Sequence, residues 1–270
     1  MGRQDYTSVR DATPRGGTPA LSDPLALEAL QGDLHLMAPS TSNGFLDGLP
    51  PEDAALLMPI LRRVDLQHDA CLIEQGDEVR DVYLPAGAEL DNIVRLEDGS
   101  GVLTASVGRE GMAGLAAFMA DTPSMWQVIV RVPGPAWAAS AAQLRPILNA
   151  TPTLHRRMLE LTHFYQAQSA QNVACEARHR VSERLARWLL TSIDNTGGDT
   201  IRITQEELAQ VLGAQRTTVV EAAGRLREQG AIRYLRAKVR VVDRPLLERQ
   251  TCECYFVIRR LAERSGFLSR

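Results

Sequence analysis

Short alternating segments of apolar and polar residues dominate the first half of the chain. Between Val64 and Ser140, brief apolar runs are separated by Gly, Pro and Asp, which is the pattern of β-strands joined by tight turns. The runs 90–96 and 102–107 flank residues 97–101, Glu-Asp-Gly-Ser-Gly, and this arrangement favours a hairpin. Many short strands at such spacing are typical of a small barrel or sandwich of roughly 80 residues. The pattern therefore predicts a β-rich domain within residues 43–150.

A long helix is predicted after Pro152, with one stripe of positions repeating at alternating spacings of four and three. The stripe consists of Leu154, Met158, Leu161, Tyr165, Gln168 and Asn172. This is the period of a coiled-coil seam, and polar residues within a seam fix register and oligomeric state. The spacing therefore predicts a parallel homodimer through residues 151–177. The alternative is a stripe packed into the core of the same chain.

Two short helices and a strand hairpin are predicted in the last part of the chain, residues 178–270. After an amphipathic helix that ends at residues 195–198, Thr204 caps the next helix and Glu207 completes a capping box. Gly213 ends this helix, and a further helix runs from about Gln215 to Gln229. The inward face of that further helix consists of Val219, Ala222, Ala223 and Leu226. Strands at 232–235 and 239–242 follow, so the order indicates a helix-turn-helix with a wing.

The net charge of the whole chain, −3, by itself argues against a nucleic-acid partner. This total conceals a difference between the two parts of the chain. Residues 1–176 carry 12 basic and 22 acidic side chains, whereas residues 177–270 carry 18 basic and 11 acidic ones. Such asymmetry is typical of proteins that bind nucleic acid. We expect the acidic domain to lie away from a duplex and the basic wing to face it.

Signals for catalysis, membrane insertion and export are missing from the sequence. The one lysine, Lys238, follows Ala237, so no phosphate-binding Gly-Lys-Ser/Thr triplet exists, and the sequence lacks GxSxG, HExxH and GxGxxG. The longest apolar run, residues 111–120, is too short to span a membrane. No signal peptide is recognisable, and four scattered cysteines do not form a disulfide framework. The sequence therefore predicts a cytoplasmic protein that is not an enzyme.

The predicted helix-turn-helix resembles that of a known family. Residues 203–213, Ile-Thr-Gln-Glu-Glu-Leu-Ala-Gln-Val-Leu-Gly, and residues 216–219, Arg-Thr-Thr-Val, are similar to the winged-helix reader of the Crp/Fnr transcription regulators. The resemblance covers most of residues 43–260 and includes Gly76-Asp77, residues 82–84 and residues 108–111. It implies an α+β fold with a cyclic-nucleotide-binding-like jelly roll as sensory domain, a dimerisation helix and a C-terminal winged helix. It also implies double-stranded DNA, a second copy of the chain and RNA polymerase as partners.

The resemblance assigns roles to residues of the reader. Arg216 stands at the family's guanine-reading arginine, and a bidentate contact to guanine is expected. Thr217 and Glu221 replace a base-reading glutamate and an arginine, so the half-site should differ from those of the best-known members. Predicted phosphate contacts are Thr204, Gln205, Thr218, Arg225 and Lys238. The rival hypothesis is a sensor that acts through protein partners without binding DNA.

The sequence departs from the family at the position of its effector. Members that bind cyclic nucleotides carry Gly-Glu and then an Arg-Ser/Thr pair, whereas Gly114 precedes Leu115 here and Met125-Trp126 replace the pair. A cyclic phosphate needs a cation or clustered donors, and apolar side chains supply neither. We therefore expect no binding of cyclic AMP or cyclic GMP, and the effector, the operator and the sign of regulation are left open.

No cofactor is predicted. Residues 1–70 lack the cysteine cluster with which some members of the family hold an iron–sulfur centre, and a haem held by His68 or Cys71 is an alternative left open. Cys252 and Cys254 are interpreted as packed thiols, because no second pair lies near them in the sequence. Residues 1–42, rich in Gly, Pro, Ser and Thr, are predicted to be a disordered tail with one short helix at Pro24–Gln31.

Overall fold

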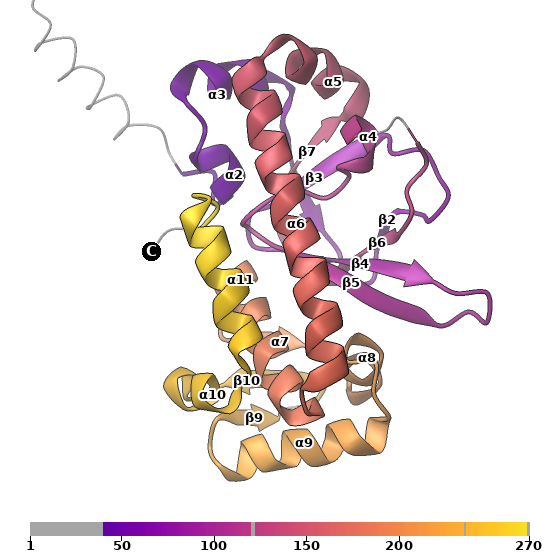
Figure 1. Cartoon of the computed structure of the whole chain (residues 1–270), viewed down its shortest axis with the longest axis vertical. Coiled ribbons are helices and arrows are strands. Elements are labelled where there is room, and N and C mark those ends of the chain that lie inside the picture. The colour runs from indigo at the N-terminus through magenta and orange to yellow at the C-terminus, as the bar shows by residue number, and fades with distance from the viewer. Residues whose placement is uncertain (1–39, 120–121, 235, 269–270) are drawn as a thin grey trace, which may run out of the picture. The chain divides into compact units, whose positions relative to one another are not determined.

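The computed structural model describes residues 40–119, 122–234 and 236–268 (Figure 1). The predicted tail up to residue 39 and its helix at Pro24–Gln31 lie outside the described residues. The described chain begins with the helices α2 (Gly44–Asp47) and α3 (Pro51–Leu57) and the 3-10 helix η1 (Met58–Ile60). Asn43 caps α2 and also donates from its buried side-chain amide to the carbonyls of Pro85 and Gly111, which ties this entry segment to the sheets.

Two antiparallel sheets follow, as the alternating pattern predicts. Their strands are β1 (Arg62–Leu66), β2 (Cys71–Ile73), β3 (Asp81–Pro85), β4 (Glu89–Arg95), β5 (Gly101–Val107), β6 (Gln127–Val132) and β7 (Gly134–Ser140). One sheet has the order β1-β7-β3 and the other the order β2-β6-β4-β5, with the short helix α4 (Ala116–Met119) between β5 and β6. The predicted hairpin joins β4 to β5, where Asp98 accepts from the Ser100 backbone and Gly99 takes a positive φ of 82°. These strands form the expected jelly-roll domain.

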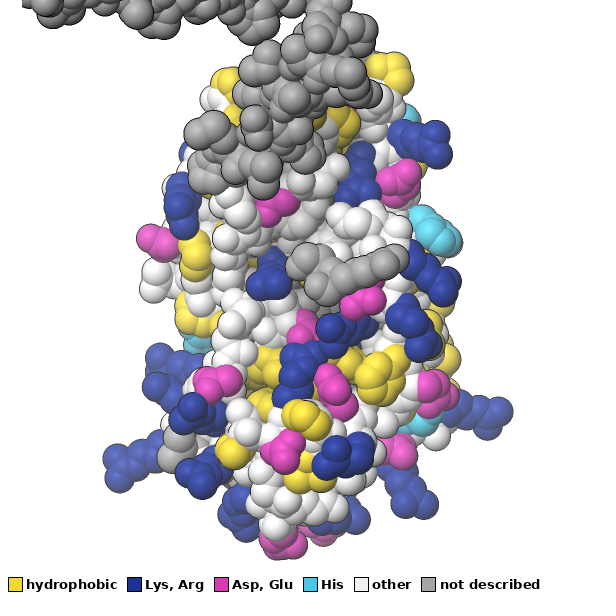
Figure 2. Space-filling view, turned by 90° about the vertical axis from the view of Figure 1, so that its left-hand side faces the viewer, with side chains coloured by type: hydrophobic (Ala, Val, Ile, Leu, Met, Phe, Trp, Pro, Cys, Tyr) yellow, Lys and Arg dark blue, Asp and Glu magenta, His cyan; other side chains and the backbone are white. Residues whose placement is uncertain are grey.

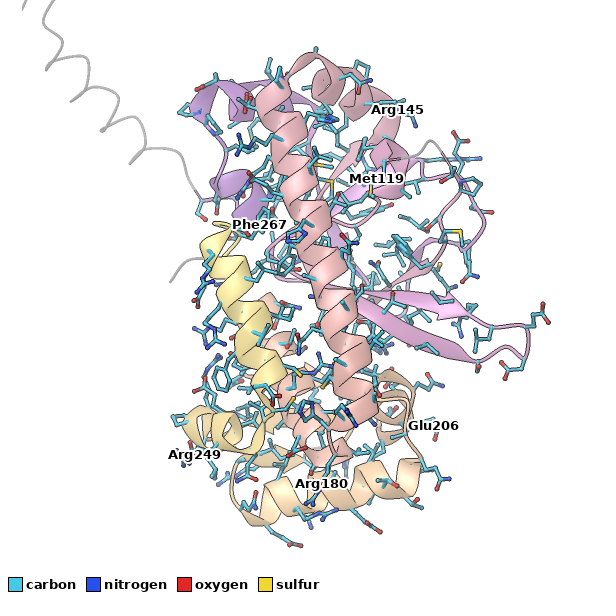
Figure 3. The ribbon with its side chains drawn as sticks, in the orientation of Figure 1. Met119, Arg145, Arg180, Glu206, Arg249 and Phe267 are labelled. Atoms are coloured by element: carbon cyan, nitrogen blue, oxygen red, sulfur yellow. The ribbon has the colours of Figure 1, made fainter. Side chains whose placement is uncertain are left out.

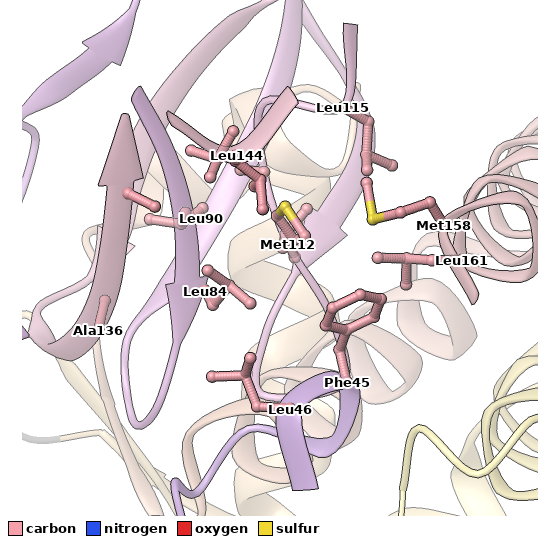
Figure 4. Packing of buried hydrophobic residues seen from close by; sticks show 14 of the residues in the cluster. Phe45, Leu46, Leu84, Leu90, Met112, Leu115, Ala136, Leu144, Met158 and Leu161 are labelled. Carbon is pink, nitrogen blue, oxygen red and sulfur yellow. The ribbon is translucent and has the colours of Figure 1, made fainter. Parts of the chain in front are cut away.

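The core of this domain lies between the two sheets and the helices that close it. Alternate strand residues point inward and are at most 2% exposed, among them Val82, Leu84, Leu90, Val107 and Val130. The helix α5 (Ala141–Ala150) adds Leu144 and Leu148. Figure 4 shows Leu84, Leu90, Met112 and Leu144 in this cluster together with two side chains from the next helix, Met158 and Leu161.

That helix, α6 (Pro152–Arg178), places the predicted dimer seam inside its own chain. Leu154, Met158, Leu161 and Tyr165 are at most 8% exposed and belong to the barrel core, and Gln168 is 6% exposed. Asn172 donates to the Thr104 carbonyl at 2.9 Å and accepts from Arg187. The assignment of this stripe to a dimer interface was therefore wrong, because the barrel buries its apolar part and Thr104 and Arg187 satisfy its last polar residue.

The opposite stripe of α6 faces solvent in this subunit. It repeats at the same spacings of four and three and consists of Leu159, His163, Gln166, Ala170, Val173 and Ala177. Leu159 is 56% exposed and Val173 is 71% exposed. Met119 of α4, 58% exposed, lies beside it, with its sulfur 3.7 Å from the Thr162 hydroxyl. Within the described residues, one heptad-spaced face of the long helix is thus largely exposed.

The C-terminal part has the predicted order of elements. The helix α7 (Val181–Thr196) ends at Gly197, whose positive φ of 75° suits a glycine cap, and is followed by β8 (Thr200–Arg202). The helix pair α8 (Gln205–Val211) and α9 (Arg216–Glu228) precedes the wing strands β9 (Ile232–Tyr234) and β10 (Lys238–Val241). Two further helices, α10 (Arg244–Gln250) and α11 (Glu253–Arg264), end the described chain.

The last helix, α11, and the residues after it contribute to the core of the barrel domain. Figure 1 shows α11 running beside α6, and Ala262 and Phe267 are buried in the barrel cluster. Arg157 of α6 donates to the carbonyls of Ser265 and Gly266, and its guanidinium lies 4.1 Å from the centre of the Phe267 ring. Among the described residues, no helix combines the length and the apolar character needed to cross a membrane.

Candidate nucleic-acid interface

The helix pair α8–α9 is built as the sequence predicts. Thr204 accepts from the Glu207 backbone at 3.2 Å, and the Glu207 carboxylate accepts from the Thr204 backbone at 2.6 Å, so the capping box is present. Gly213 takes a φ of +53° in the turn. The inward residues Val219 and Ala222 are fully buried, and Ala223 and Leu226 are 2% exposed. Burial of this face fixes which face of α9 is presented to solvent.

The outward face of α9 carries the residues predicted to read bases. Thr217, Val220 and Glu221 are exposed and share one face because they are spaced by three and four residues. Arg216 is exposed at the first position of the helix, and Arg225 is exposed one turn after Glu221. Thr218 is half-buried, so it is less accessible than its neighbours. In Figure 1, α9 lies on the side of the helix-turn-helix that points away from the barrel.

The wing presents a basic face that the sequence prediction covered only in part. In β10, Lys238 and Arg240 are exposed while Val239 and Val241 are buried. The register places Arg202 of β8 opposite Lys238 and Arg233 of β9 opposite Arg240. All four basic side chains therefore lie on one side of the sheet. Like charges directly opposite each other are unfavourable on their own, so this face suits a polyanion.

The start of α8, the start of α9 and the wing tip line one cleft of about 500 Å³. Its lining includes Thr204, Gln205, Arg216 and Arg236. Thr204 uses its hydroxyl oxygen as acceptor in the cap and can still donate its hydrogen, as a phosphate requires. The structure thus brings the predicted residues Thr204 and Arg216, 12 positions apart in the sequence, into one cleft and adds Arg236 to them. Lys238 does not line this cleft and lies on the adjoining face of the wing.

Basic side chains are concentrated around this part of the molecule. Figure 2 shows dark blue Lys and Arg side chains projecting from the lower part, which in Figure 1 contains α8, α9, α10 and the wing strands. Of the wing arginines, Arg240 is paired with Asp199 at 2.8 Å, and both side chains are exposed. Such an exposed pair stabilises little, so it leaves the face available to phosphates. The sequence analysis did not assign Arg202, Arg233 and Arg240 to this face. Each of them is next to a buried strand residue, and this alternation could have indicated that they lie on the same side of the sheet as Lys238.

An ionic network joins the barrel to α8, the first helix of the helix-turn-helix. Arg131 of β6 is 5% exposed and contacts Asp91 at 2.7 Å and Glu207 at 3.4 Å. His68 contacts the same Glu207 carboxylate at 3.3 Å. Although burial raises the pKa of Glu207, hydrogen bonds from Thr204 and the charges of Arg131 and His68 lower it overall. Glu207 therefore both caps α8 and holds that helix against the barrel.

A second polar junction connects the barrel to α7. The buried Glu89 carboxyl accepts from Ser192 and from the Asn195 side-chain amide, the latter at 3.1 Å. Burial away from water, with a further contribution from the nearby Asp91, raises the pKa of Glu89 to about 8. The neutral carboxyl is therefore the form that the folded protein favours around neutral pH.

Replacing Glu89 with glutamine tests this junction. Because the pKa of the folded state lies above that of the unfolded state, the stability due to the neutral carboxyl is complete in acid and is lost as the pH rises toward 8. We expect the wild-type protein to lose about 2 kcal/mol more than Glu89→Gln between pH 6 and pH 8. Urea unfolding at several pH values measures this difference; parallel pH profiles for the two proteins would show that Glu89 is already ionised in the fold.

At the family's cyclic-nucleotide positions the structure places a buried leucine and an exposed methionine, and the two candidate haem ligands contact protein atoms. Leu115 is 7% exposed within the barrel core, and Met125 is 71% exposed. Both ring nitrogens of His68 contact protein oxygens, Nδ1 at 3.0 Å from the Arg131 carbonyl and Nε2 near Asp69 and Glu207. Cys71 donates to the Ile73 carbonyl. Although His68, Asp69 and Glu207 are close enough to share a metal ion, the Arg131 guanidinium already supplies a positive charge to Glu207.

The described residues combine a jelly-roll barrel, a long helix and a winged helix-turn-helix. Residues 183–250 match the model of the Crp-like helix-turn-helix domain. Among curated proteins, none matches the sequence. The C-terminal part of the chain is therefore similar to a Crp-like helix-turn-helix domain.

Solved structures share the fold over most of the described chain. FixK2 from Bradyrhizobium japonicum aligns with a TM-score of 0.60 and 14% identity, covering 72% of this chain and 98% of its own. A Crp/Fnr-family regulator from Eubacterium rectale aligns with a TM-score of 0.60 and 15% identity, covering 78% and 99%. The regulator CLP from Xanthomonas campestris, described as responsive to c-di-GMP, aligns with a TM-score of 0.56 and 14% identity, covering 72% and 100%. The resemblance to Crp/Fnr regulators is thereby confirmed at the level of fold and reader.

Proposed function

We propose that this protein is a homodimeric transcription regulator that binds a specific sequence of double-stranded DNA. The observation that carries the proposal is the combination of an exposed polar face on α9 with a wing sheet whose solvent side holds four basic residues. A helix of this kind fits a major groove, and a basic hairpin beside it can contact the flanking phosphates. With DNA as its target, the protein is proposed to act in the cytoplasm. The resemblance to Crp/Fnr regulators also suggests RNA polymerase as a partner.

The proposed base-reading residues are Arg216, Thr217 and Glu221. Arg216 can form two parallel hydrogen bonds to guanine, Thr217 can contact a thymine methyl group, and Glu221 can accept from the amino group of cytosine. Thr204, Gln205, Thr218, Arg225 and Lys238 are proposed to contact phosphates, with Arg202, Arg233 and Arg236 added by the structure. These contacts would position the helix without selecting a sequence.

The proposed dimer forms through the solvent-exposed stripe of α6. Heptad spacing allows two such stripes to pack against each other along their length, with Leu159, Ala170 and Val173 as the apolar positions. The small side chains of Ala170 and Ala177 permit close approach of the two helices. Two readers related by a twofold axis would then engage half-sites about 34 Å apart in a palindromic operator.

We further propose that the barrel does not bind cyclic AMP or cyclic GMP at the family's usual position. Leu115 is packed into the core, so no carboxylate from this position reaches a ribose. Any signal could reach α8 through Arg131 and His68, which hold Glu207.

The salt dependence of binding tests the proposal. Gel shifts with a pool of random duplexes should show affinity falling linearly on a double logarithmic plot, by about 0.9 in slope for each phosphate neutralised. Arg202→Ala combined with Lys238→Ala should reduce this slope by about 2. The matched control, Arg80→Ala with Arg156→Ala, removes two exposed arginines outside residues 178–270 and should leave the slope unchanged. Absence of any retained duplex at low salt would favour the rival hypothesis of a sensor that acts through proteins.

A further inference from the structure

Three cysteines and one histidine, residue types that often bind metals, meet where α6 ends and α7 begins. Cys175 and His179 lie one turn apart at the end of α6, and Cys252 and Cys254 lie at the start of α11. Their ligand atoms are all within 4.8 Å of one another. The three cysteines are at most 5% exposed, and the His179 side chain is 19% exposed. The fold therefore gathers a compact, largely buried group from two segments about 75 residues apart.

We propose that these residues form a Cys₃His site for a single zinc ion. Tetrahedral zinc with bonds of about 2.3 Å to sulfur and about 2.1 Å to nitrogen places two sulfurs about 3.8 Å apart and a sulfur and a nitrogen about 3.6 Å apart. The Sγ atoms of Cys175 and Cys252 are 3.6 Å apart, and Cys254 Sγ is 3.5 Å from His179 Nδ1. Both separations fit ligands that share one ion.

The same distances disfavour other uses of the thiols. A disulfide requires sulfur atoms about 2.05 Å apart, well below the observed separation. An iron–sulfur cluster distributes its ligands over two or more irons and therefore needs a more widely spaced set. Three thiolates with one imidazole in a compact tetrahedral arrangement are a donor set that selects zinc.

The surroundings of the four ligands have the features of an outer metal shell. His179 Nε2 lies 3.2 Å from the Glu253 carboxylate, so the imidazole can donate its outer N–H while Nδ1 faces the thiols. Gln171 donates its amide N–H to Cys254 Sγ at 3.1 Å. Arg184 interacts electrostatically with the Cys175 and Cys252 thiols, and Arg187 interacts with the Cys175 thiol. The two positive charges would offset the net negative charge of a zinc ion bound by three thiolates. The Gln171 amide and the two arginines favour the negative charge of bound thiolates, and Glu253 fixes the orientation of the imidazole.

The location of this site suggests what the ion does. His179 caps the end of α6, and α7, the first helix of the C-terminal part, begins two residues later at Val181. An ion bound here would join the end of the long helix to the start of α11 across this joint. It would therefore hold the reader in a fixed direction relative to α6. This structural role does not depend on whether the reader binds DNA.

The metal content of the purified full-length chain tests the site. We expect one zinc per chain by mass spectrometry, and we expect Cys252→Ser and Cys254→Ser to lose it. Cys71→Ser, which changes the exposed cysteine outside the cluster, should retain it. Glu253→Gln keeps all four ligands and should weaken zinc binding about 10–100-fold.

Cobalt gives a second readout that does not rely on the ligand variants folding normally. Adding Co²⁺ to the reduced, zinc-stripped wild-type protein should produce thiolate charge-transfer bands and the visible bands of tetrahedral cobalt at one equivalent. A reduced protein that contains no zinc and shows no such bands would overturn the proposal. Iron with acid-labile sulfide, or a Cys175–Cys252 disulfide in protein prepared without oxygen, would overturn it as well.

Discussion

Replacing Ala170 and Val173 with glutamate is expected to turn the proposed dimer into a monomer and to lower its affinity for a palindromic duplex by about 10²–10⁴-fold. Both residues lie on the exposed stripe of α6, and Val173 is 71% exposed in the single subunit. Four carboxylates would meet in the dimer seam, whereas each subunit alone loses no contact of its core. Sedimentation equilibrium measures the mass, and gel shifts measure the affinity.

The control for this prediction adds the same charge elsewhere. Ala142→Glu with Asn149→Glu places two carboxylates on the exposed side of α5 and should leave both mass and affinity unchanged. A dimer that survives glutamate at both stripe positions would show that the subunits associate through another surface. The Leu161→Glu substitution, by contrast, should unfold the subunit, since Leu161 is fully buried in the barrel core.

Removing the Arg216 side chain is expected to cost about 1–3 kcal/mol of binding free energy on the preferred duplex and to relax the preference at one base pair of each half-site. The reason is that a bidentate contact to guanine is lost while the phosphate contacts stay. Competition gel shifts with duplexes that vary a single position measure both effects. Arg249→Ala is the matched control, because Arg249 is exposed on α10 and lies across the lower part of the molecule from Glu206 of α8 (Figure 3).

An equal loss of affinity on every sequence would assign Arg216 to the phosphate backbone instead. That outcome would be compatible with its place in the cleft that it shares with Thr204 and Arg236. It would move the reading of bases to Thr217 and Glu221, which lie further along the same helix. The two outcomes differ in the pattern of base preference and not in the affinity alone.

The local elements of this fold were predictable because their signals are short in range. The Thr204–Glu207 capping box, the glycine in the turn before α9 and the hairpin at residues 97–101 each depend on residues within a few positions of one another. The inward face of α9 was predictable for the same reason, since helical periodicity alone sets it.

The direction in which α6 faces was not predictable in the same way. Both sides of this helix carry heptad spacing, and the sequence does not state which side meets the barrel. The more apolar stripe packs against the larger core, where Leu161 and Tyr165 are buried. Asn172, which suggested an oligomeric seam, is satisfied by Thr104 and Arg187 of the same chain. A polar residue in a heptad stripe indicates a dimer only when no partner within the chain is available.

The cysteine–histidine cluster could not be predicted from the sequence, for a different reason. Cys252 and Cys254 form an unusually close pair, and Cys175 with His179 has the spacing of one helical turn. Nothing local links the two pairs, because the contact arises only when α11 runs back along α6. The spacing of four between Cys175 and His179 was the one signal that could have drawn attention to the end of the helix.

Selection of duplexes from a random pool by the full-length protein is the decisive test of specific DNA binding. We predict enrichment of a palindrome whose half-sites are centred about one helical turn apart. Each half-site should contain a guanine whose selection disappears for Arg216→Ala. Recovery of a pool without sequence preference, or retention of no DNA at low salt, would contradict specific DNA binding by α9 and the wing.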